Sequence, residues 1–255
     1  MTRFLLVSGA AAAVCVVAML ITAYAARRAG RVSVVDVTWG IALAAVAVTS
    51  AVLGDGDPLR RWLFVGLVTV WGVRLSWHIF RRNTGHGEDP RYTELLGSKR
   101  GGPLVRVWMP QGAAIWFVSL PVQVSAVSGD GLGLVVVLGV VLWVVGVFFE
   151  AVGDAQLAAY KRDPDRGPVM DRGLWRYTRH PNYFGDACVW WGLWTIAASA
   201  WPGALTVPAP LAMTYFLVYA TGARLLEETM MKRRGYPEYA ARTSMFVPLP
   251  PRRGA

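Results

Sequence analysis

The chain has 255 residues, of which 55% are hydrophobic and 16% are charged, and it carries a formal net charge of +10. This composition is too apolar for an ordinary soluble domain and predicts an all-α polytopic membrane protein, built as a single helical domain over residues 1–255. The charge does not predict nucleic-acid binding, because the cations lie between long apolar runs, where membrane topology accounts for them. The two cysteines, Cys15 and Cys188, lie inside apolar runs and predict neither a disulfide nor a metal site.

Seven apolar segments follow one another, most of them close to the ~20 residues that a membrane-spanning helix needs. If they alternate across the membrane, every Lys and Arg except Arg3, Arg60, Arg61 and Arg74 belongs to or borders connections on one side. The positive-inside rule then predicts seven transmembrane helices in the inner (plasma) membrane, with the N-terminus outside and the C-terminus in the cytoplasm. Cleavage of the first segment as a signal peptide would violate this charge pattern, so we expect the segment to be retained. The segments are 4–26, 32–53, 62–80, 107–127, 132–160, 183–201 and 207–226.

Ionisable residues inside the second and third segments need an explanation, since such groups are costly in a membrane. Asp36 lies one turn inside the second segment, where it can act as a hydrogen-bond or proton donor, pair with Arg74, or cap the start of the helix. Trp71, Arg74 and His78 are spaced i, i+3 and i+7, so they share a helical face that must point inward. Arg74 requires an anion, either an internal carboxylate or a ligand phosphate. His78 is more simply structural and is kept as a reserve proton donor.

The connection RRNTGHGEDPRY (81–92) mixes turn residues with Glu88, Asp89 and Arg91. A solvated loop can have this composition. The compact order of two acids, Pro, Arg and Tyr nevertheless predicts a structured loop with an internal ion pair, able to fold over a ligand.

Later polar groups fit a negatively charged, ribose-bearing cofactor. Glu150, Asp154 and Lys161 lie on one stripe of the fifth helix and offer acceptors for a ribose or carboxamide and a cation for phosphate, although the helix dipole explains the same order. The loop 171–186, DRGLWRYTRHPNYFGD, adds cations, rings, an amide and a carboxylate, and the end of the seventh segment adds a further group of charges. Those charges are Arg224, Glu227, Glu228, Lys232, Arg233 and Arg234.

Common catalytic fingerprints do not occur. The sequence has no dinucleotide-binding strand, glycine loop and helix, no Walker-type sequence and no GxSxG elbow. Three scattered histidines, His78, His86 and His180, lack the spacing of a zinc site. We therefore expect no bound metal and no hydrolysis by those routes.

Four motifs together resemble the bacterial DUF1295 proteins, relatives of the steroid 5-alpha-reductase superfamily, from about residue 36 to 250. RHPNYFG alone also resembles the RHPxYxG of isoprenylcysteine carboxyl methyltransferases and phospholipid methyltransferases, whose cofactor is S-adenosylmethionine. The motifs are GEDPRY (87–92), FEAVGDAQLAAYK (149–161), GLWRYTRHPNYFGD (173–186) and LLEETMMKRRGYPEYAARTSMFVPLP (225–250).

The resemblance implies a seven-helix enzyme that takes NADPH from the cytoplasmic side and reduces a carbon-carbon double bond in a lipid or steroid-like substrate entering from the bilayer. Asp36 matches an acidic residue that helps polarise the substrate carbonyl. Trp71 falls where steroid reductases have a catalytic tyrosine. Because an indole N–H is not a proton source, a protonated Asp36, with Tyr92 or His78, would have to supply the proton.

The resemblance also assigns cofactor contacts, and Arg179 or Arg162 would favour NADPH over NADH. The match of Arg82 is loose because the loop length differs. The candidate cofactor residues are Arg74, Arg82, Glu150, Asp154, Lys161, Tyr177, Arg179, His180, Asn182, Tyr183, Asp186, Arg224 and Glu228.

Two other functions are compatible with parts of the sequence: an S-adenosylmethionine-dependent lipid or isoprenylcysteine-type methyltransferase, and a non-enzymatic scaffold or transporter. The charged stripe ending at Lys161, together with GEDPRY, favours a phosphate-rich cofactor over S-adenosylmethionine. A transporter is disfavoured because no inverted repeat is evident and the polar groups crowd at one face. The particular lipid, the preference for NADPH over NADH and the oligomeric state stay open.

Overall fold

A computed structural model describes residues 1–97, 102–129, 133–220 and 222–252. Among these residues every regular element is a helix and none is a strand, so the all-α prediction is confirmed. The chain forms two compact units, which are described separately. The first unit comprises Met1–Gly133 and Ala197–Ala209, and the second comprises Leu134–Ile196 and Pro210–Ala255.

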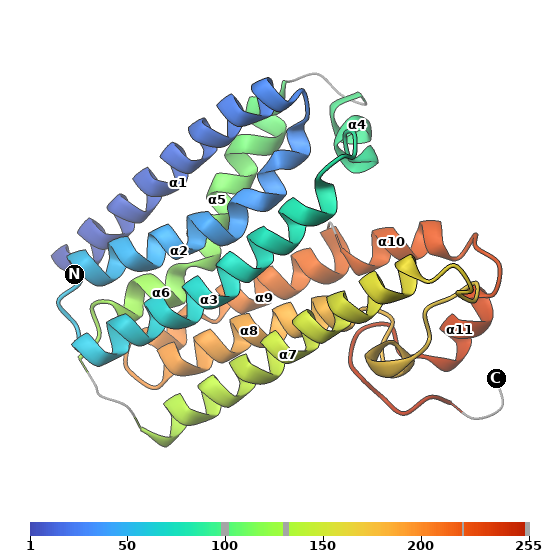
Figure 1. The fold of residues 1–255 in the computed structure, drawn as a ribbon. Helices are drawn as coiled ribbons and strands as arrows, with labels where there is room; N and C mark the ends of the chain where they lie inside the picture. The colour runs from blue at the N-terminus through green and yellow to red at the C-terminus, as the bar shows by residue number, and fades with distance from the viewer. Residues whose placement is uncertain (98–101, 130–132, 221, 253–255) are drawn as a thin grey trace. The chain divides into compact units, whose positions relative to one another are not determined.

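The first unit is built around α1, α2 and α3, which pack in sequence order, with α5 against α1 (Figure 1). Residues at the helix ends account for the boundaries. Gly30, with φ 65°, ends α1 in the left-handed conformation that glycine adopts at low cost. Asp57 starts α3 by accepting a hydrogen bond from the Arg60 amide at 2.8 Å, followed by Pro58 at the first helical position. The elements are α1 (Thr2–Ala29), a 3-10 turn (Val32–Val34), α2 (Val35–Leu53), α3 (Pro58–Asn83), α4 (Pro90–Gly97), a π-helical turn (Leu104–Trp108), α5 (Met109–Val118), α6 (Leu120–Ser125) and a 3-10 turn (Gly203–Thr206).

The second unit contains the long helix α7 beside α8 (Figure 1). Glycines spaced seven residues apart allow this close approach. A Cβ on Gly146 would lie 2.6 Å from the Gly185 carbonyl oxygen, and one on Gly139 would lie 2.8 Å from that of Gly192. The elements of this unit are α7 (Leu134–Arg162), a 3-10 turn (Gly173–Arg176), α8 (Pro181–Ala198), α9 (Pro208–Tyr215), a π-helical turn (Phe216–Ala220), α10 (Ala223–Met230) and α11 (Tyr236–Arg242).

Five helical stretches of the described chain are long and apolar enough to cross a membrane, which identifies a multi-pass membrane protein. They coincide with the first, second, third, fifth and seventh predicted segments. The fourth segment is divided, because Pro121 cannot continue the hydrogen-bond ladder of α5. The sixth is the 18-residue α8. Seven spans and the orientation of the termini therefore stay predictions. The five stretches are Thr2–Ala29, Val32–Leu53, Pro58–Asn83, Leu134–Arg162 and Gly203–Met230.

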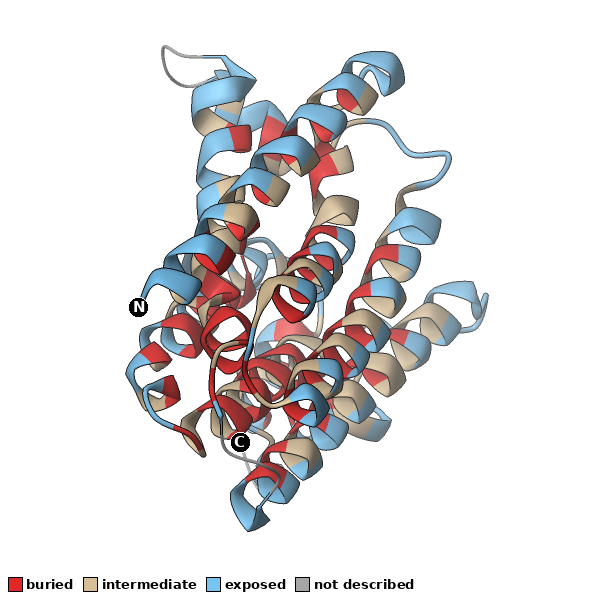
Figure 2. Cartoon of the chain, turned by 90° about the vertical axis from the view of Figure 1, so that its left-hand side faces the viewer, coloured by how far each residue is buried: buried red, intermediate tan, exposed pale blue. Residues whose placement is uncertain are grey.

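Burial follows the helix faces (Figure 2), where red buried residues alternate with pale blue exposed ones along each helix. On α1, Val7, Ala11, Cys15 and Met19 form a buried stripe with a spacing of four residues. Large apolar side chains such as Leu20, with 63% of its surface exposed, occupy the outer face. An exposed apolar face on a long helix is the surface expected to meet lipid.

Candidate functional site

In the first unit, the GEDPRY motif folds over Asp36. Asp89 accepts a hydrogen bond from the Arg91 amide at 2.9 Å, and Pro90 takes the first position of α4. The Arg91 guanidinium then lies between two carboxylates, 2.8 Å from Asp89 Oδ2 and 3.2 Å from Asp36 Oδ2. The predicted internal ion pair of this loop is thereby confirmed, and Asp36 pairs with Arg91 rather than with Arg74, the partner considered from the sequence.

Tyr92 completes this arrangement. Its hydroxyl donates a hydrogen bond to Asp36 Oδ1 at 2.5 Å, and the side chain is buried, with 7% exposed. Burial and the neighbouring Asp36 carboxylate raise the pKa of Tyr92 well above its ordinary value of 10.0, so the phenol keeps its proton at neutral pH. The Tyr92 hydroxyl is thus a protonated donor held against Asp36 Oδ1.

Glu88 joins the two segments that carry this pair. Its carboxylate accepts hydrogen bonds from the amides of Val32 and Ser33, the latter at 2.9 Å, at the start of α2. Burial alone would raise its pKa, but these amide hydrogen bonds lower the pKa of Glu88 below its ordinary value of 4.5. We refer to Asp36, Glu88, Asp89, Arg91 and Tyr92 as the Asp36 cluster.

The other candidates of the first unit lie on α3. Trp71 is fully buried, and Arg74 and His78 are half-buried on the predicted common face. Arg82, at the end of α3, is exposed and donates to the Asn83 side-chain oxygen at 3.3 Å.

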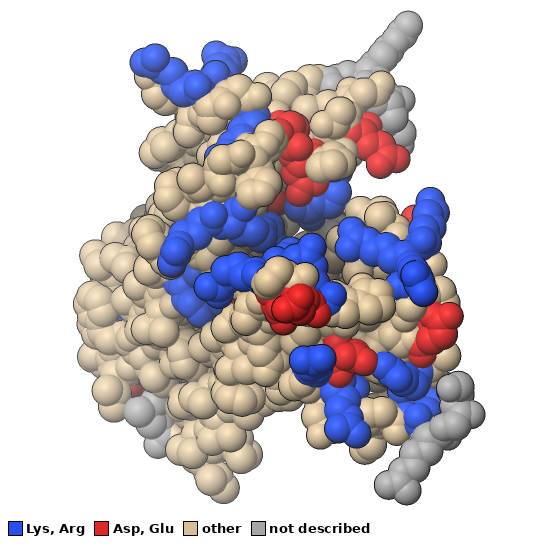
Figure 3. Space-filling view, turned by 45° about the vertical axis from the view of Figure 1, so that its right-hand side comes forward, with Lys and Arg blue, Asp and Glu red and all other residues tan. Residues whose placement is uncertain are grey.

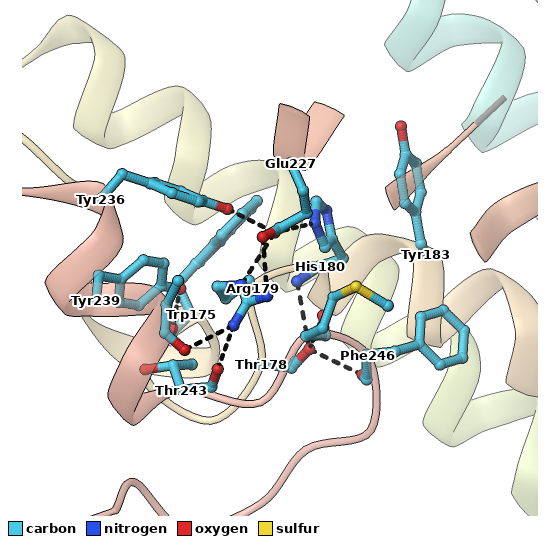
Figure 4. Close-up of polar contacts among 12 residues, drawn as sticks. Trp175, Thr178, Arg179, His180, Tyr183, Glu227, Tyr236, Tyr239, Thr243 and Phe246 are labelled. Carbon is cyan, nitrogen blue, oxygen red and sulfur yellow. Dashed lines mark hydrogen bonds and ion pairs between the residues drawn. The ribbon is translucent and has the colours of Figure 1, made fainter. Parts of the chain in front are cut away.

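In the second unit, Arg179 and His180 of the RHPNY motif meet the carboxylate of Glu227 (Figure 4). The Arg179 guanidinium makes a bidentate ion pair with Glu227 at 2.9 and 2.8 Å. His180 Nε2 lies 2.8 Å from the same carboxylate, and the Tyr236 hydroxyl donates to it at 2.7 Å. We call Arg179, His180, Glu227 and Tyr236 the Glu227 hub.

The hub fastens the C-terminal tail to the motif. Arg179 also donates to the carbonyl oxygens of Ala240 at 2.9 Å and Thr243 at 2.6 Å. The Thr178 hydroxyl donates to the Phe246 carbonyl at 2.8 Å, and the Leu249 amide donates to the Tyr177 carbonyl at 3.0 Å. Arg179 is therefore committed to the protein itself, which weakens its sequence-based assignment to a cofactor phosphate.

Carboxylates and an amide meet where α7 packs on α8. The Asn182 amide donates to Asp154 Oδ1 at 3.2 Å, and Glu150, Asp154 and Asp186 are all buried. The ring of Tyr183 stacks on His180 at a centroid distance of 5.6 Å. The remaining candidates Tyr177, Lys161, Arg224 and Glu228 are exposed.

A pocket of about 540 Å³ lies along the C-terminal end of α7 in the second unit. Its lining includes the side chains of Tyr160, Arg166, Arg172 and Arg242, together with three aspartates. Figure 3 shows that blue basic side chains lie beside red acidic ones on one face of the molecule. The sequence offered Arg172 only as one of the cations of the loop 171–186 and did not single out Arg166, in the loop after α7, or Arg242, the last residue of α11.

The sequence places Glu227 in a group of charges but does not predict that it pairs with Arg179, His180 and Tyr236. Arg179 and Glu227 are 48 residues apart, and no local rule pairs residues at that distance. The nearest signal was the density of cations and rings in the motif, which does indicate a need for anionic partners.

These features define a helical multi-pass membrane protein with polar clusters at its helix ends. The sequence matches the family described as "Protein of unknown function (DUF1295)" over residues 7–243, so the chain belongs to the DUF1295 family. It is also similar to steroid 5-alpha-reductase DET2 of Arabidopsis thaliana, with 34% identity over 68 residues, which cover 26% of this chain and 26% of that protein. The match thus spans about a quarter of the curated relative's length. No solved structure matches the chain.

Proposed function

We propose that this protein is a membrane reductase that uses NADPH to reduce a carbon-carbon double bond conjugated to a carbonyl group in a lipid or steroid-like substrate. The similarity to a protein named as a steroid 5-alpha-reductase supports the reaction class. The observation that carries the proposal is the hydrogen bond from Tyr92 to Asp36, a proton-bearing pair at the start of an apolar helix. When bound, NADPH supplies the hydride.

The Asp36–Tyr92 pair suits the carbonyl end of such a substrate. Reduction places negative charge on the carbonyl oxygen, and a hydrogen-bond donor fixed in advance stabilises that charge. The Tyr92 hydroxyl is one such donor, and Asp36 is a second one when its carboxyl group is protonated. Arg91 keeps the Asp36 carboxylate in place through its 3.2 Å contact. Tyr92 supplies the phenol that steroid reductases carry at the position of Trp71.

The groups of the second unit fit a phosphate- and ribose-bearing cofactor. Glu150, Asp154 and Asn182 provide carboxylate and amide groups for ribose hydroxyls or a carboxamide. Since Arg179 is engaged by Glu227, we assign phosphate recognition to the pocket that contains Arg166 and Arg172.

The test is direct binding of NADPH, NADH and S-adenosylmethionine to the detergent-purified protein, with Asn182→Ala as the cofactor-site variant and Gly66→Ala, in open space on α3, as the matched control. We expect NADPH to bind the wild type and the control but to bind Asn182→Ala at least about tenfold more weakly. Binding of S-adenosylmethionine without NADPH would overturn the proposal in favour of a methyltransferase.

Turnover is tested by incubation with lipid enones and NADPH, followed by mass spectrometry of the organic extract. A product that is heavier by two hydrogens and whose fragmentation shows an intact carbonyl group identifies reduction of the carbon-carbon double bond. A screen in which NADPH binds but no enone is reduced contradicts the substrate class.

A further inference from the structure

The 3-10 turn that leads into α2 is bonded to a residue from a distant part of the chain. A helix leaves its first amides without partners, and a side chain just before it usually accepts one of them. Neither Arg31, before the 3-10 turn, nor Val34, before α2, makes a side-chain cap hydrogen bond. The Glu88 carboxylate, 55 residues further on, accepts from the Ser33 amide instead.

The same carboxylate is tied to the segment that carries Tyr92. The Asp89 amide donates to Glu88 Oε1 at 3.0 Å, so one oxygen holds amides from both segments. Arg31 strengthens the junction by donating to the carbonyl oxygens of Asn83 at 2.6 Å and His86 at 3.0 Å. These contacts lock the loop before α4 to the turn before α2.

Asp36 and Tyr92 lie just beyond this junction on either side. Asp36 is three residues after Ser33, and Tyr92 is four residues after Glu88. Their hydrogen bond is short and directional, so a small shift of either backbone would break it. A displacement of about 1 Å at a reacting group is enough to reduce turnover strongly.

We propose that Glu88 is a positioning residue, which braces the GEDPRY loop against the start of α2 and so holds Tyr92 in hydrogen-bond register with Asp36. Its effect on turnover rests on the reductase function proposed above. Its effect on the geometry of the loop does not.

The chain offers well-matched variants for the test. Glu88→Ala removes the carboxylate, whereas Glu88→Gln keeps the shape and one acceptor oxygen. Glu94→Ala removes an exposed glutamate from α4, the helix that follows Glu88, and serves as the control. Each variant is purified in detergent as the full chain and checked by size-exclusion chromatography.

Two measurements report the geometry without relying on activity. Hydrogen exchange of the segment containing Val32 and Ser33 should be at least about tenfold faster in Glu88→Ala, intermediate in Glu88→Gln and unchanged in Glu94→Ala. In protein labelled with 3-fluorotyrosine, the ¹⁹F resonance of Tyr92, assigned by its loss in Tyr92→Phe, should move in the same order. Unchanged exchange and an unchanged resonance in Glu88→Ala would overturn the proposal.

Activity provides the third measurement. We expect kcat for a lipid enone to fall about tenfold in Glu88→Ala with NADPH affinity unchanged, and to recover partly in Glu88→Gln. An unchanged kcat in a variant whose Tyr92 resonance has moved would overturn the positioning role. A wild type that reduces no enone would overturn the reductase function instead, and exchange and fluorine spectra would still decide whether Glu88 braces the loop.

Discussion

At the scale of single residues, two carboxylates each bind several side chains from distant parts of the chain. Asp36 shares its two oxygens between Tyr92 and Arg91, and Glu227 shares its oxygens among Arg179, His180 and Tyr236. The first carboxylate holds a proton donor in place, whereas the second holds a loop to a tail.

The phenol of Tyr92 is expected to matter for turnover and not for cofactor binding. Tyr92→Phe removes the hydroxyl but keeps the ring, so kcat for an enone should fall by about 10²-fold while NADPH affinity stays the same. Steady-state kinetics and isothermal titration check the two quantities separately. Equal losses of turnover and of NADPH affinity would contradict the role given to Tyr92.

Removal of the hub carboxylate should destabilise the second unit. Glu227→Ala leaves Arg179, whose side chain is only 11% exposed, without its bidentate partner, and we expect a loss of about 3 kcal/mol. Thermal unfolding in detergent measures the loss. Glu228→Ala, at the adjacent exposed position, is the control and should change stability by less than about 0.5 kcal/mol.

At the scale of elements, helix contacts in both units are made through glycine. In the first unit a Cβ on Gly40 would lie 2.0 Å from the Gly72 carbonyl oxygen, and in the second Gly146 meets Gly185 in the same way. Backbone cannot give way as a flexible side chain can, so these positions fix the separation of α2 from α3 and of α7 from α8.

A large side chain at such a contact should separate α7 from α8. Gly146→Leu is expected to cost at least about 2 kcal/mol in the free energy of unfolding. Gly66→Leu places the same side chain in open space on α3, so its melting temperature in detergent should stay close to that of the wild type. Similar losses in both variants would show that the helix contact is not the cause.

The closure of α4 over Asp36 should depend on pH. Burial alone would raise the pKa values of Glu88 and Asp89. Hydrogen bonds from the amides of Val32 and Ser33 nevertheless lower the pKa of Glu88 below 4.5, and Arg91 lowers the pKa of Asp89 below 3.8. Groups whose folded-state pKa is lowered contribute stability above their ordinary pKa and lose it as the pH falls through the folded-state value.

Exchange protection of α4, corrected for intrinsic rates, should therefore be constant from about pH 8 to pH 5 and decrease below about pH 4.5. In Glu88→Gln the decrease should be smaller. Protection that rises as the pH falls would contradict this origin.

At the scale of the whole molecule, charge sets the expected orientation. Arg3 and Asp55 form an ion pair at 3.2 Å, in agreement with the prediction that the N-terminus and the connection between α2 and α3 lie on the same side. The connection after α3 carries the first large group of cations and is expected in the cytoplasm.

Single cysteines test this orientation. In a protein whose own Cys15 and Cys188 are replaced by Ala, Asp55→Cys should react with an impermeant maleimide added to intact spheroplasts. His86→Cys should react only after permeabilisation. The reverse labelling pattern would invert the topology.

The sequence by itself determined the properties that depend on composition and short spacing. Apolar length and the placement of cations identified an all-helical membrane protein, because hydropathy and charge act locally. The ion pair of Asp89 with Arg91 was predictable for the same reason, since the two residues are only two positions apart. Four motifs in order were sufficient to indicate the DUF1295 family, which the match over residues 7–243 confirms.

Only the tertiary structure decided which distant groups meet. The 3-10 turn before α2 is capped by Glu88 from 55 residues away, and Arg179 is neutralised by Glu227 from 48 residues away. Each pairing depends on how helices pack, and a guanidinium read from sequence alone suits a ligand phosphate and an internal carboxylate equally well. The physical reason is that the charge of a side chain determines the kind of partner it requires, whereas the packing of the helices determines which group lies close enough to be that partner.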